Sequence, residues 1–152
     1  MALKTWESLS DDSRFWCFIA STPWQEDQQS QVDQALAMLC MNWKAHGEPV
    51  AAGFQTVDRR VIALAADESQ LASASGCSVD SVMRSLQELG SQLNLDLFNR
   101  MNIYVRKDAS SEWQRLPLKD ARQFDGEFLD SIAQRKADWQ AVRPIKGSWL
   151  AP

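Results

Sequence analysis

The spacing of apolar residues predicts four strands between residues 14 and 107. The stretches with the pattern of strands are 14–20, 50–57, 60–66 and 101–106. The runs at 14–20 and 60–66 are apolar on both faces, as expected of central strands. The stretch 101–106 alternates cleanly between apolar and polar residues, which predicts a half-exposed edge strand.

Two longer stretches carry an apolar face at helical spacing. The face of the first helix consists of Val32, Ala35, Leu36, Leu39, Cys40 and Trp43. We expect this helix to begin with a capping box at Thr22-Pro23 and to end at His46, before Gly47. The second helix is expected to begin near Ser78, and its face consists of Val79, Val82, Met83, Leu86, Leu89 and Leu93.

The order of these elements is β-α-β-β-α-β, which predicts an α+β fold with a ferredoxin-like core over 14–107. In that arrangement the strands lie in the order 4-1-3-2, antiparallel, with both helices on one face. The opposite face of the two-sided apolar strands then needs a cover.

The segment 108–152 is expected to supply this cover as a mostly helical, Trp-rich C-terminal extension that packs on the sheet. Its helical stretches are predicted at 118–124 and 127–139. The candidate covering residues are Trp113, Phe124, Phe128, Leu129, Ile132, Trp139 and Trp149. The alternative is a homodimer that buries the open face sheet to sheet. With 152 residues in total, we expect a single domain over 1–152.

Composition excludes several classes of partner. The chain has 16 Lys+Arg against 20 Asp+Glu, a net charge of −4, so no basic excess favours nucleic acid. No apolar run approaches the ~20 residues of a membrane span. The polar face of the first helix is rich in Gln and Asp, which argues against a membrane surface.

Three cysteines predict a reducing compartment. Cys17, Cys40 and Cys77 are an odd number in different contexts, so a disulfide framework is not expected. The segment 1–14 is charged and lacks the apolar region of a secretory signal. We therefore expect a cytoplasmic protein.

The predicted topology gathers chemically interesting residues at one rim of the sheet. The end of the first helix, the end of the third strand and the start of the second helix all reach that edge, as does the end of the fourth strand with Arg106 and Lys107. The candidate site residues there are His46, Gly47, Asp67, Glu68, Ser75, Gly76, Cys77, Ser78 and Asp80.

Two kinds of chemistry fit this rim. Cys77, just before a helix N-terminus, is favoured as a thiolate nucleophile with His46 as base. The same N-terminus, with Ser75, Gly76 and Ser78, would instead hold a small anion. The alternatives are structural: His46 as a residue at a helix C-terminus, Ser78 as an N-cap and Cys77 as an idle thiol.

Other sites are not supported. The chain has no phosphate-binding loop and no dinucleotide fingerprint. One His and scattered Cys do not make a zinc site, and the spacing of Asp67, Glu68 and Asp80 does not support a carboxylate metal site, so no metal is expected. The sequence leaves it unknown whether the protein binds a cofactor.

Several short stretches resemble a known family. They are N-W-K-A-H-G-E-P (42–49), A-A-D-E-S (65–69), S-G-C-S-V-D-S-V (75–82), D-L-F-N-R-M (96–101) and S-W (148–149). The family consists of small uncharacterised bacterial proteins found mainly in the Bacteroidetes, some of which carry the label "ABC transporter ATPase". Its recurring residues include most of the rim residues, His46 and Cys77 among them, and it implies no activity. The ATPase label does not fit a chain without a phosphate loop.

Three hypotheses about function follow. The first is a binding or regulatory module that holds a small anionic ligand or a protein partner at the rim near Cys77 and His46. The second is a thiol-dependent enzyme with Cys77 as nucleophile and His46 as base. The third is a structural or assembly protein that uses a Trp-rich face.

Overall fold

The computed structural model describes residues 3–152, which form two compact units. Unit 1 comprises the chain up to Phe98 together with Ile132–Trp139. Unit 2 comprises Asn99–Ser131 and Gln140–Pro152. The expectation of a single domain stays a prediction.

A three-stranded antiparallel sheet forms the centre of unit 1. Its strands are β1 (Arg14–Ile19), β5 (Val61–Ala66) and β4 (Ala52–Val57), in the order β1-β5-β4. All six residues of β5 are buried, because the strand has a neighbour on each side and cover on both faces. The two predicted central strands therefore lie side by side, as expected.

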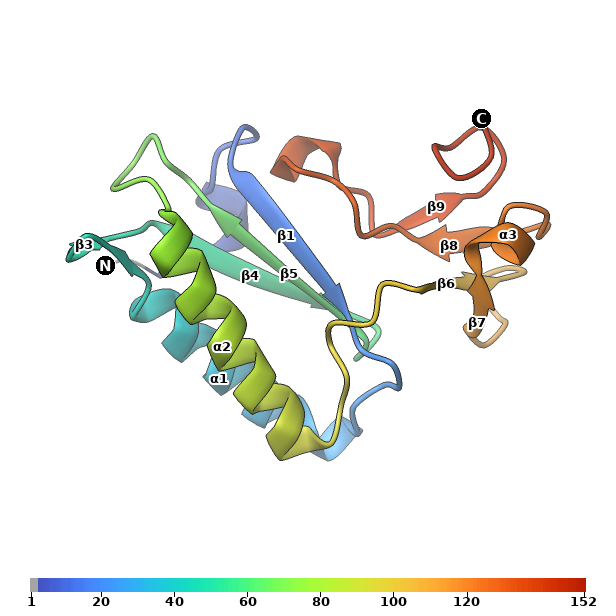
Figure 1. Cartoon of the computed structure of the whole chain (residues 1–152), viewed down its shortest axis with the longest axis horizontal. Helices are drawn as coiled ribbons and strands as arrows, with labels where there is room; N and C mark the ends of the chain where they lie inside the picture. The colour runs from blue at the N-terminus through green and yellow to red at the C-terminus, as the bar shows by residue number, and fades with distance from the viewer. Residues whose placement is uncertain (1–2) are drawn as a thin grey trace. The chain divides into compact units, whose positions relative to one another are not determined.

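Two helices cover one face of this sheet, side by side (Figure 1). They are α1 (Gln29–Met41) and α2 (Gly76–Leu93). Val32, Leu36 and Cys40 of α1 are buried, which is the face that the apolar spacing predicts. From α2, the buried apolar residues are Val82, Leu86, Leu89 and Leu93.

The start and the end of α1 differ from the prediction. The capping box lies at Gln25 and Gln28, around the 3₁₀ turn η2 (Glu26–Gln28), rather than at Thr22. The helix ends at Met41, after which β2 (Lys44–Ala45) and β3 (Glu48–Pro49) form a short hairpin. The two residues at its tip, His46 and Gly47, have φ of 53° and 80°. Positive φ at both positions is what a tight two-residue hairpin turn requires, and Gly adopts it at no steric cost.

The other face of the unit 1 sheet is covered by two segments distant in sequence. From the N-terminal segment, with η1 (Trp6–Ser8), the Trp6 ring lies 6.3 Å from that of Phe15. From the segment with η3 (Lys136–Asp138), the Trp139 ring lies 5.0 Å from that of Phe15. The backbone N–H of Phe15 also donates to the carbonyl of Gln134 at 3.1 Å, so this segment covers part of the outer edge of β1.

Unit 2 is a separate four-stranded antiparallel sheet in the order β7-β6-β8-β9. The strands are β6 (Asn102–Arg106), β7 (Gln114–Pro117), β8 (Glu127–Leu129) and β9 (Val142–Pro144), and a short helix α3 (Leu118–Ala121) follows β7. Its buried core consists of Val105, Ala121, Phe128, Ile145 and Leu150. Both edge strands end in a proline, which has no N–H to offer to a further strand.

The predicted fold class is therefore wrong in two respects. The strand at 101–106 exists as β6, but it pairs with β7 and β8 and not with β1, so the sheet of unit 1 has three strands and is not a complete ferredoxin-like core. The segment 108–152 is mostly strands and irregular chain, not a helical extension. Of its expected covering residues, Phe128 and Trp149 pack in the core of unit 2.

Candidate binding groove

The start of α2 is closed by its own side chains. Ser75 is the N-cap: its Oγ accepts from the backbone N–H of Ser78 at 3.2 Å, and Ser78 Oγ accepts from the N–H of Ser75 at 2.9 Å. Ser78 is buried, and its Oγ also accepts from Nε1 of buried Trp43 at 3.1 Å. The predicted N-cap, Ser78, is thus the third residue of the helix, and it joins α2 to the chain that follows α1.

Three other predicted site residues lie exposed in the first turns of α2. Gly76, Cys77 and Asp80 all face solvent. Cys77 is the exposed cysteine, while Cys17 and Cys40 are buried, and burial raises the pKa of Cys40 to about 12. Cys40 is therefore a core residue, and Cys77 is the accessible thiol.

His46 and Gly47 lie at the exposed tip of the β2–β3 hairpin. This position is five residues beyond the end of α1, so His46 is not the helix-terminal residue that the pattern suggested. Within residues 3–152, no hydrogen bond links His46 to Cys77. The nucleophile–base pair of the second hypothesis is thus not formed in this structure.

Asp67 is buried at the end of β5 and holds the N-terminal segment in place. Its carboxylate accepts from the backbone N–H of Ser10 at 2.9 Å, from the N–H and Oγ of Ser69 and from the side chain of Gln70 at 2.8 Å. Burial acts to raise the pKa of Asp67, but these hydrogen bonds outweigh it and hold the pKa well below its usual range. These contacts connect the end of β5 to the N-terminal segment and to the loop that follows β5.

Glu68 faces a cation of the same unit. Its Oε1 lies 3.9 Å from Nε of Arg14, and the Arg14 guanidinium also donates to the carbonyl of Ala74 at 3.1 Å. Arg14 additionally lies over the ring of Trp16. These contacts connect β1 with the loop before α2.

The predicted rim is therefore assembled only in part. The structure joins Ser75 and Ser78 to Trp43, and it occupies Asp67 and Glu68 with contacts inside unit 1. Arg106 and Lys107 were expected there only because β6 was placed beside β1, and that pairing does not exist. Among the described residues, no group of three or more His, Cys, Asp or Glu is arranged to hold a metal ion.

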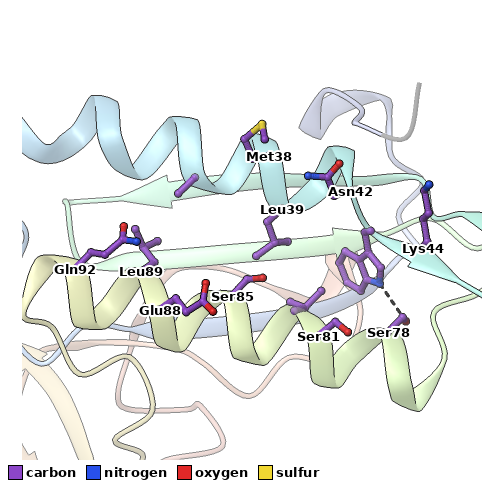
Figure 2. A pocket seen from close by; sticks show the side chains of 13 residues that line it. Met38, Leu39, Asn42, Lys44, Ser78, Ser81, Ser85, Glu88, Leu89 and Gln92 are labelled. Atoms are coloured by element: carbon purple, nitrogen blue, oxygen red, sulfur yellow. Dashed lines mark hydrogen bonds between the residues drawn. The ribbon is translucent and has the colours of Figure 1, made fainter.

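A hollow of unit 1 lies between α1 and α2 and has a volume of about 440 Å³. Figure 2 shows it as a groove along both helices. Its residues come from α1, from the chain just after α1 and from one side of α2: Ala35, Met38, Leu39, Asn42, Trp43, Lys44, Ser78, Ser81, Val82, Ser85, Glu88, Leu89 and Gln92. One end, at Ser78 and Trp43, adjoins the predicted rim.

The two walls of the groove differ in chemistry. On the α1 side are Ala35, Met38 and Leu39, and Met38 is 56% exposed. On the α2 side an exposed polar row runs along the helix through Ser81, Ser85, Glu88 and Gln92, while Val82 and Leu89 are buried beneath it. The arrangement combines apolar contact with a row of hydrogen-bonding groups.

The groove was not predicted from the sequence, because the apolar spacing of each helix indicates its core face and not what borders that face. A signal was present, because residues 81, 85, 88 and 92 are spaced by four, three and four and lie on one side of α2. Met38, which directly precedes Leu39 of the apolar face of α1, was a second signal.

In comparisons with protein-family models, curated proteins and solved structures, the chain matches none of them. The resemblance to the bacterial family stays a prediction. Over residues 3–152, none of the helices combines the length and the apolar character that crossing a membrane requires.

Proposed function

We propose that this protein is a peptide-binding module, which receives a segment of a partner protein in the groove between α1 and α2. The observation that carries the proposal is the open groove of about 440 Å³ with an apolar wall. Ligand sites in proteins are concave, mostly apolar and supplied with a few polar groups that fix orientation. The proposal retains the hypothesis of a binding module with a protein partner and extends its site from the rim into the groove.

Exposed methionines on α1 support a protein partner. Met38 lines the groove, and Met41, one turn further along the same helix, is 45% exposed. Exposed Met side chains are flexible and polarisable, and they are common on surfaces that bind peptides.

The other hypotheses have less support. A small anion at the start of α2 would compete with the cap that Ser75 and Ser78 already form. A thiol enzyme needs a base within reach of Cys77, and His46 lies on the hairpin tip without a hydrogen bond to it. A Trp-rich docking face is not favoured, because all seven Trp side chains are buried or half-buried.

A blocking substitution tests the proposal. Peptides would be selected from a random display library on the wild-type protein, and each would be bound to the wild type and to Ser85→Trp by fluorescence anisotropy. Ser85 is exposed and lines the middle of the groove, so an indole there fills the space that a peptide needs. We expect a loss of affinity of about tenfold or more, since the lost contacts are central ones.

Ser91→Trp is the matched control. Ser91 is exposed on the same helix but does not line the groove, so this variant should bind the selected peptides as the wild type does. The proposal fails if the library yields no binding peptide, or if the selected peptides bind Ser85→Trp as tightly as the wild type.

A further inference from the structure

The groove has one charged residue toward each end. Lys44 directly follows Trp43, whose indole is hydrogen-bonded to Ser78, so Lys44 belongs to the end where α2 begins (Figure 2). Glu88 lies ten residues after Ser78 on α2, which is about 15 Å at the helical rise per residue. Within residues 3–152, neither Lys44 nor Glu88 forms an ion pair.

The polar wall favours an extended occupant over a helical one. A helix satisfies its own backbone N–H and C=O groups, whereas an extended segment must find partners for them. Ser81 Oγ donates to the carbonyl of Cys77 at 3.2 Å, which leaves its lone pairs to accept from a ligand N–H. Ser85 and Gln92 continue this row of hydrogen-bonding groups along α2.

We infer that the occupant is an extended segment with an apolar middle, a carboxylate at the Lys44 end and a cation at the Glu88 end. A span of about 15 Å corresponds to about five extended residues. Met38 and Leu39 face the apolar middle, and the two charges fix the register of the segment in the groove. This inference rests on the proposed function and specifies the chemistry of the partner.

Three designed peptides test the charge pattern. All have blocked ends and the same apolar residues between two charged residues five positions apart. The first has one acidic and one basic residue, the second has two acidic residues and the third has two basic residues. At low salt, we expect the wild type to bind the mixed peptide about threefold to tenfold more tightly than either of the others, because surface charge pairs contribute modestly.

Charge reversal of the protein should change this preference in a specified way. Lys44→Glu should prefer the peptide with two basic residues, and Glu88→Lys should prefer the one with two acidic residues. The double variant should prefer the mixed peptide again, since it can bind in the opposite direction. Arg84→Glu changes the net charge as Lys44→Glu does, but Arg84 is exposed outside the groove, so it should leave the wild-type preference unchanged.

The outcomes separate this inference from the proposed function. Equal binding of the three peptides, with all three weakened by Ser85→Trp, overturns the inference and leaves the proposed function standing. The same holds if none of the three binds although library-selected peptides do. Binding of designed and selected peptides that is insensitive to Ser85→Trp overturns both.

Discussion

The two units of this chain build a core by different means. In unit 1, the strand β5 is buried along its whole length between two neighbouring strands, and apolar residues cover both of its faces. In unit 2, the strands have three to five residues and the core has five fully buried apolar residues. Each unit also buries a carboxylate, Asp67 in unit 1 and Asp130 in unit 2. Asp67 is held by neutral donors, whereas Asp130 contacts the charged Arg143 at 3.1 Å and Nε1 of Trp149 at 3.2 Å.

The difference shows how size limits the means of stabilisation. A small unit buries a smaller share of its surface, so apolar burial alone specifies it weakly. In unit 2, the Asp130 contacts tie β8 to β9 and to the C-terminal segment, and Arg106 pairs with Glu127 at 2.7 Å between β6 and β8. We interpret these charges as fixing the register of short strands.

The largest effect is expected from Phe128→Ala. Phe128 is fully buried in unit 2 and packs edge-to-face against Trp149, so its removal should cost about 3–5 kcal/mol of unfolding free energy. Hydrogen exchange should show lost protection in β6, β8 and β9, with β5 still protected. The half-exposed Leu118 offers the control, since Leu118→Ala should cost much less. An equal loss of protection in β5 would show that the two units unfold together.

A smaller effect is expected from Asp130→Asn. The change keeps the shape but removes the charge that holds Arg143, at a cost of about 2–3 kcal/mol in a urea unfolding curve. The cost stays below that of a fully buried pair because the Arg143 side chain is 33% exposed and can be hydrated. Asp120→Asn, at an exposed position in the same unit, should change stability by less than about 0.5 kcal/mol. If both variants behave alike, the charges of unit 2 do not contribute as we describe.

The smallest effect is expected from Asp67→Asn, in the unit that depends on apolar burial. At neutral pH the loss of a multiply bonded carboxylate should cost about 1–2 kcal/mol. Since the pKa of Asp67 is lower in the folded chain than the unfolded value of about 3.9, its contribution is complete above that pH and is lost as the pH falls below it. Urea unfolding at several pH values should therefore show the wild type and the variant converging in acid. A gap that stays constant down to pH 2 would contradict this explanation.

Local patterns predicted most elements of unit 1 because each pattern reports the burial of its own residues. The spacing at Val32, Leu36 and Cys40 identified the buried face of α1, and the continuous run at 60–66 identified the central strand. The predicted end of α1 was less accurate, because the residues after the helix form a hairpin. The sequence at the hairpin tip has the same residue types as a helix C-terminus. A Gly after a His, with a Pro two residues further on, suits either structure.

Local patterns do not show which strands pair with each other. The alternation at 101–106 correctly predicts a strand, but the expected edge strand is wrong, since β6 lies between β7 and β8. Alternation does not say which strands β6 pairs with. Gly126 is consistent with the pairing of β6 and β8. A side chain at this position would overlap the carbonyl of Arg106, because the backbone of β6 and the chain before β8 lie close together. At the candidate site the same failure affected Arg106 and Lys107 alone, because only these two were placed at the rim from an assumed fourth strand.

The interleaved chain of the two units has a consequence for synthesis. Unit 1 receives its last segment, residues 132–139, only after most of unit 2 has been made. Until Gln134 has been synthesised, the backbone N–H of Phe15 at the outer edge of β1 lacks its hydrogen-bond acceptor. An unpaired strand edge on a nascent chain can pair with strands of other chains. A chain cut after Phe98 would keep that edge open permanently, so we expect such a fragment to aggregate even though it contains all three strands of its sheet.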